Sequence, residues 1–93
     1  MDQEETRELL RSHLETWRRR SYGDLVGLLG RPQVAQVHGA SGVTYHVEVE
    51  VFWDGDRGGP VRVLGSIDDG GWRAFKPLTD AFILAPDGTF VGE

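Results

Sequence analysis

The spacing of the apolar residues changes once along the chain, near Pro32. Before this proline, apolar residues recur every three or four positions, which is typical of an amphipathic helix. From Gln33 onward they alternate with polar residues, which is typical of strands with one buried face. The sequence therefore predicts helices in the first third of the chain and a β-sheet in the rest.

The first helix is predicted from Gln3 to Arg20. Asp2 should cap its first turn, with Glu5 as the reciprocal partner three residues later. A second, short helix is predicted from Tyr22 to Leu29, and the glycine and proline that follow should end it. The buried stripe of the first helix is formed by Thr6, Leu10, His13, Leu14 and Trp17, widened by Leu9.

Short turns separate the predicted strands, and this implies an antiparallel meander. The strands are expected at Gln33–His38, Val43–Trp53, Val61–Ile67, Trp72–Phe75, Ala81–Ala85 and Thr89–Val91. We therefore predict a single α+β domain over residues 1–93. Its N-terminal amphipathic helix and short second helix should pack on one face of an antiparallel β-meander of four to six strands.

The alternation also predicts which side chains share a face. Trp53 should pair with Val61 across the turn between them, and after the next turn Ala74 should pair with Gly65 and Trp72 with Ile67. At Gly65 and Ala74, the small residues would leave room for a close helix or an aromatic ring. The face that receives the helix is then formed by Val47, Val49, Val51, Val61, Val63, Ile67 and Trp72.

The opposite face brings Phe52, Leu64 and Phe75 together beside Arg62. Contiguous apolar area outside a core commonly marks an interface. We therefore expect an interaction surface at these four residues, for a second copy in a homodimer or for another protein. The alternative is that the C-terminal hairpin covers the apolar residues or that they are scattered on the surface.

A second hypothesis is a small-ligand-binding or enzymatic domain. Its pocket would lie between helix and sheet and would be lined by Trp17, Tyr45, Trp53 and Trp72. Since no catalytic polar group accompanies these aromatic residues, the sequence favours a non-enzymatic interaction module and assigns no catalytic residue.

Charge and composition narrow the class of partner. The chain is small and acidic, with 93 residues, 15 Asp and Glu, 10 Lys and Arg, and a net charge of -5. The acidic excess falls in residues 32–93, which disfavours nucleic acid as a partner.

Cysteine is absent, so disulfides and thiolate metal sites are excluded. No apolar run approaches the ~18 residues that cross a bilayer, and the acidic start is unlike a signal peptide. We expect a cytoplasmic protein that does not contact membranes.

Three groups of polar residues have side chains of the types that bind metals or transfer protons. They are His46, Glu48 and Glu50 in one strand, Asp54 and Asp56 in a turn, and Asp68 and Asp69 in another. Strand spacing holds the first group too far apart for one ion, the second lacks the bidentate Glu of a calcium loop, and the third is a solvated turn. We expect no metal and no cofactor.

Four short runs carry a family resemblance: VFWD at 51–54, SIDDGGW at 66–72, PLTD at 77–80 and APDG at 85–88. With the N-terminal helix, they resemble a group of small uncharacterised bacterial α+β proteins with no assigned activity, which implies a domain that stands alone. The layout is also similar to cystatin-like folds. However, AQVHG at 35–39 has Ala35 where cystatin inhibitors have Gln, and no Pro-Trp loop follows, so protease inhibition is not implied.

Overall fold

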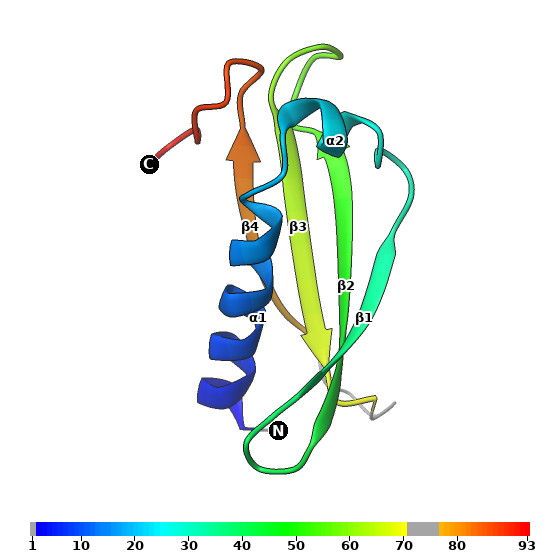
Figure 1. The fold of residues 1–93 in the computed structure, drawn as a ribbon, viewed down its shortest axis with the longest axis vertical. Coiled ribbons are helices and arrows are strands. Elements are labelled where there is room, and N and C mark those ends of the chain that lie inside the picture. Colours follow the sequence, from blue (N-terminus) through cyan, green and yellow to red (C-terminus); the bar gives the residue numbers. More distant parts are fainter. Residues whose placement is uncertain (1, 71–76) are drawn as a thin grey trace.

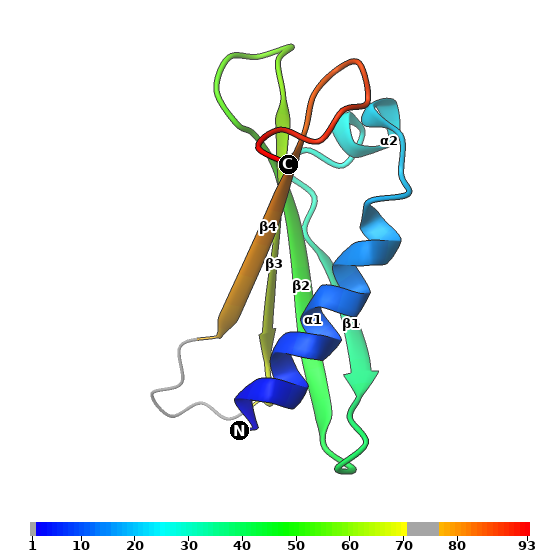
Figure 2. The same cartoon turned by 90° about the vertical axis from the view of Figure 1, so that its left-hand side faces the viewer.

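A computed structural model describes residues 2–70 and 77–93, in which two helices lie on one side of a four-stranded antiparallel sheet (Figures 1 and 2). The strands follow one another in chain order across the sheet, as a meander does. This confirms the α+β class and the antiparallel sheet. The elements are α1 (Gln3–Trp17), α2 (Tyr22–Val26), β1 (Gln33–His38), β2 (Thr44–Trp53), β3 (Val61–Asp68) and β4 (Leu78–Leu84).

Both helices begin where predicted and end earlier. Asp2 caps α1, because its carboxylate accepts a hydrogen bond of 3.0 Å from the backbone N–H of Glu5. The reciprocal bond expected from the Glu5 side chain is not made, since that carboxylate accepts hydrogen bonds from Ser41 in the turn between β1 and β2 and from Tyr45 of β2. α2 ends at Val26 because Gly27 forms its C-cap, and Gly30 follows with φ 72°, which suits a residue without a Cβ.

The inner face of the sheet forms the core with α1. Trp53 pairs with Val61, so the predicted register of β2 and β3 is confirmed. A Cβ added at Gly65 would lie 3.0 Å from methyl carbons of Leu10 and Leu14, so the helix approaches the sheet closely at this glycine. The fully buried strand residues there include Val47, Val49, Val61, Val63 and Ile67.

The fourth strand departs from the prediction. Gly65 pairs with Asp80 and Ile67 with Leu78, so the expected pairings to Ala74 and Trp72 are wrong. β4 begins directly after Pro77, a position where a proline removes no hydrogen bond from the ladder. The predicted strand Trp72–Phe75 lies outside the described residues.

The C-terminal segment is attached on the helix side of the sheet. Phe90 packs edge-on against Phe82, a buried residue of β4, with ring centroids 5.8 Å apart. Arg18 at the end of α1 lies over both rings and pairs with Glu93. In place of the predicted strand Thr89–Val91, the structure has only an isolated bridge between Phe90 and Leu84. The segment therefore does not take the predicted alternative position over the outer face.

Candidate interaction surface

The outer face of the sheet is the face opposite the two helices (Figure 2). Near the end of β2 it carries a shallow hollow of about 400 Å³ lined by Phe52, Trp53, Asp54, Arg62 and Leu64. Three of the four predicted interface residues thus lie together, and the fourth, Phe75, lies outside the described residues. Phe52 is 39% exposed, a large fraction for an aromatic side chain in a strand.

Two further residues extend this apolar area across β4. Cross-strand pairing places Ala81 beside Leu64 and Ile83 beside Arg62. Side chains paired across strands lie on the same face, so Phe52, Leu64, Ala81 and Ile83 form one surface, here called the outer patch. Ala81 and Ile83 were not among the predicted interface residues because β3 pairs with Leu78–Leu84 and not with the segment expected beside it.

The charge inside the outer patch is neutralised locally. The Nε and Nη2 atoms of Arg62 donate to one carboxylate oxygen of Asp54, at 3.0 and 2.8 Å. Arg62 is therefore paired with Asp54 and not with Glu48 or Glu50 of the same face. Because Arg62 is paired with Asp54 of the same chain, the two side chains together add no net charge to the outer patch. The aliphatic stem of Arg62 contributes apolar surface.

The same face becomes acidic farther along β2. Glu48 and Glu50 are two positions apart, and their side chains lie on one face of the strand. Desolvation raises the pKa of the Glu50 carboxyl above its ordinary value of 4.5, and a hydrogen bond and repulsion from Glu48 raise it further. The outer face thus has an apolar end and an acidic part.

The four aromatic residues predicted to line a ligand pocket are not gathered in one place. Tyr45 and Trp53 stand at opposite ends of β2, roughly 26 Å apart at the usual rise of a strand. Trp17 is buried at the end of α1, and Trp72 lies outside the described residues. The room beside Gly65, expected for a close helix or an aromatic ring, is filled by leucines of α1.

Tyr45 instead belongs to a polar contact that joins the helix to the sheet. Its hydroxyl donates a hydrogen bond of 2.7 Å to Glu5, and the N–H and hydroxyl of Ser41 donate to the same carboxylate at 3.0 and 2.7 Å. The bonds from Ser41 and then from Tyr45 lower the pKa of Glu5, and the contact with Glu5 raises the pKa of the Tyr45 hydroxyl. This cluster fixes the start of α1 against the turn between β1 and β2.

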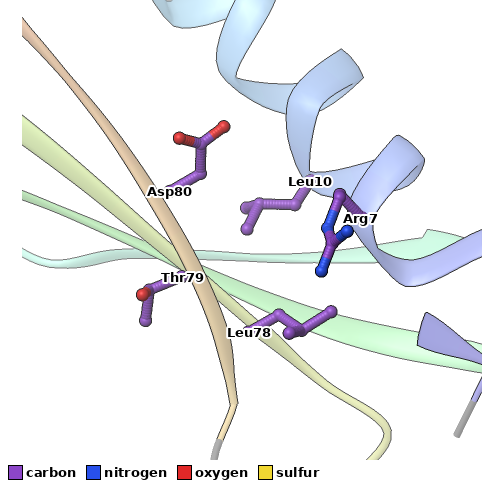
Figure 3. A pocket seen from close by; sticks show the side chains of 5 residues that line it. All are labelled: Arg7, Leu10, Leu78, Thr79 and Asp80. Carbon is purple, nitrogen blue, oxygen red and sulfur yellow. The ribbon is translucent and has the colours of Figure 1, made fainter. Parts of the chain in front are cut away.

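A smaller pocket of about 220 Å³ lies between α1 and β4 (Figure 3). Arg7 and Leu10 reach it from the helix, Leu78 and Asp80 reach it from the strand, and Thr79 points away (Figure 3). It holds one cationic and one anionic side chain without an ion pair between them. This composition defines no recognisable acid-base or nucleophilic arrangement.

Within residues 2–70 and 77–93, no group of three or more His, Asp or Glu side chains is placed to hold a metal ion. No helix in this part of the chain is long and apolar enough to span a membrane.

No protein-family model, curated protein or solved structure matches the chain. A functional proposal therefore depends on the chain's own surfaces.

Proposed function

We propose that this chain is a non-enzymatic interaction domain that associates with a second copy of itself through the outer face of its sheet. The outer patch supports this proposal: an apolar surface around a hollow, on the face that neither helix covers. Contiguous apolar area of this kind loses contact with water when two proteins associate.

The chemistry of the outer patch favours a second copy as the partner. In an isologous dimer, the same surface of each copy meets the other. Since Arg62 is already paired with Asp54, two outer patches can face each other without bringing like net charges together. Glu50 is the cross-strand neighbour of Leu64 and borders the outer patch, and Glu48 lies two positions farther along β2.

The experiment is sedimentation of the wild type and Phe52→Glu over a range of protein concentrations. We expect the mass of the wild type to rise with concentration and that of Phe52→Glu to rise less, because the new carboxylates would be buried against apolar side chains. Val43→Glu is the matched control, since Val43 is also 39% exposed but precedes the other end of β2. It should associate like the wild type.

A wild type that stays monomeric at high concentration would contradict the proposal. Equal association of Phe52→Glu and the wild type would show that the outer patch is not the contact. Circular dichroism spectra of all three proteins would establish that the substitutions leave the fold intact.

A further inference from the structure

The two edges of the sheet differ in how they are protected. At β4, the N–H of Val91 donates to the carbonyl of Ile83 at 2.9 Å, so the C-terminal segment covers part of the edge. Asp80 of the same strand lies on the inner face, and an inward charge is a common device that prevents edge-to-edge pairing. β1 forms the other edge and pairs only with β2 within the described residues.

The hydrogen-bonding pattern shows which backbone groups of β1 point outward. The N–H of Gly39 donates to the carbonyl of Val43 at 2.9 Å, which makes these two a hydrogen-bonded pair. Antiparallel ladders alternate between bonded and non-bonded pairs, so the backbone of Ala35 and Val37 points toward β2. The N–H and C=O groups of Val34, Gln36 and His38 therefore point away from the sheet.

β1 also lacks the residues that normally protect an edge. Its sequence, QVAQVH, contains no Lys, Arg, Asp, Glu, Pro or Gly. Val34 is 68% exposed and lies on the outer face of the sheet. An uncharged, uninterrupted edge of this kind is a template for another strand.

We propose that β1 pairs in antiparallel orientation with β1 of a second copy, about a two-fold axis at Gln36, so that one sheet continues across both copies. On the outer face, this register places Val34 opposite the second copy's His38, and Gln36 opposite its own equivalent. On the inner face, Ala35 lies opposite the second copy's Val37. No like charges oppose each other, Ala35 and Val37 pair as two apolar side chains, and Gln36 pairs with the same amide of the second copy.

Charges beside β1 complement each other in the same register. Arg31 falls opposite Ser41 of the second copy, and Ser41 holds the carboxylate of Glu5. The cation that precedes β1 thus faces an anion at the far end of its partner strand. The two-fold axis repeats this pairing at both ends of the contact.

Within residues 2–70 and 77–93, each copy offers one open edge, because the C-terminal segment and Asp80 guard β4. The pairing therefore closes after two copies and does not propagate into a fibre. It uses a different surface from the outer patch and does not depend on self-association there.

The test is made in the Phe52→Glu background, which removes contact through the outer patch and separates the two proposals. Gln36→Lys places two ammonium groups at the two-fold axis, and we expect the dissociation constant to rise at least about tenfold. Gln33→Lys is the matched control, since it adds the same charge to the same strand but lies opposite Gly39 of the second copy.

Sedimentation should show a dimer for Phe52→Glu and for Phe52→Glu with Gln33→Lys, and a monomer for Phe52→Glu with Gln36→Lys. Hydrogen exchange gives an independent result: the amides of Val34, Gln36 and His38 should become protected as concentration rises. Rapid exchange of these amides at every concentration would overturn the proposal, whatever the mass. So would equal association of the Gln36→Lys and Gln33→Lys proteins.

Discussion

The two faces of this sheet are made by the same strands but differ in how deeply their side chains are buried. On the inner face, alternate residues such as Val47 and Val63 are completely buried beneath α1. On the outer face, alternate residues of the same strands include Phe52, which remains 39% exposed. Strand periodicity thus separates two sets of side chains, and the position of the helix decides which set becomes the core. The apolar residues on the other side are available for contact with a partner.

A matched pair of leucine truncations should show the largest difference between the faces. Leu14→Ala removes buried contacts with the inner face and is expected to lower the free energy of unfolding by about 2–5 kcal/mol. Leu64→Ala, on the outer face, should cost about 1 kcal/mol or less in dilute protein. Urea denaturation measures both values.

The cost of Leu64→Ala should increase with protein concentration, because association stabilises the folded wild type by mass action. The cost of Leu14→Ala should change less. Equal losses for the two variants at every concentration would contradict the distinction between a core face and a contact face.

Two glutamates should give a smaller, pH-dependent difference. The pKa of Glu5 is lowered, so its stabilising effect is present above the ordinary value of 4.5 and is lost as the pH falls through the folded-state pKa. The pKa of Glu50 is raised, so its ionisation destabilises the fold as the pH rises from 4.5 through the folded-state pKa. Glu5→Gln should therefore lower stability at neutral pH, whereas Glu50→Gln should raise it.

Thermal unfolding of the two variants and the wild type, from neutral pH to below the ordinary glutamate pKa, measures these effects. The difference between each variant and the wild type should shrink once the carboxyl is protonated in both the folded and the unfolded protein. Parallel curves for Glu5→Gln and the wild type would show that Glu5 does not supply the acid sensitivity.

The smallest expected effect concerns the C-terminal segment. Arg18→Gln removes the ion pair with Glu93 and the contacts with two phenylalanine rings, and should cost less than about 1 kcal/mol. Hydrogen exchange at the Val91 amide should become faster, while exchange in β2 stays unchanged. Arg19→Gln is the control because Arg19 is exposed and adjacent in sequence. The same acceleration in both variants would mean that Arg18 does not hold the segment.

The sequence predicted the pairing of β2 and β3 correctly for a local reason. The inner-face positions of both strands carry apolar residues or glycine throughout, and Trp53 and Val61 flank the turn that connects the strands. Since a slip by one residue would move every buried valine to the outer face, the pattern permits one register only.

The fourth strand could not be predicted in the same way. Asp80 occupies an inner-face position of β4 and interrupts the alternation there. The aromatic residues before Pro77 gave a stronger strand signal than the segment after it. Asp80 is accommodated because it is exposed at the sheet edge and its partner Gly65 has no side chain. The pairing of Asp80 with Gly65 is a tertiary contact, and the local pattern of apolar and polar residues does not reveal it.

The candidate site was predictable to the extent that it depended on alternation. Phe52, Leu64 and Arg62 meet as expected, whereas Ala81 and Ile83 join them only through the pairing of β4. The bond between Glu5 and Tyr45 joins residues far apart in the chain, and no local pattern marked it.

The close contact of α1 with β3 and β4 has a consequence for synthesis on the ribosome. The helix is translated before Gly65 and before the residues of β4 that cover its leucines. The apolar stripe of α1 must therefore stay exposed to water, or be bound by a chaperone, until β3 and β4 have emerged from the ribosome. The core can consequently form only after β3 and β4 have been translated. A ribosome stalled before β3 would expose the apolar stripe of α1 to water.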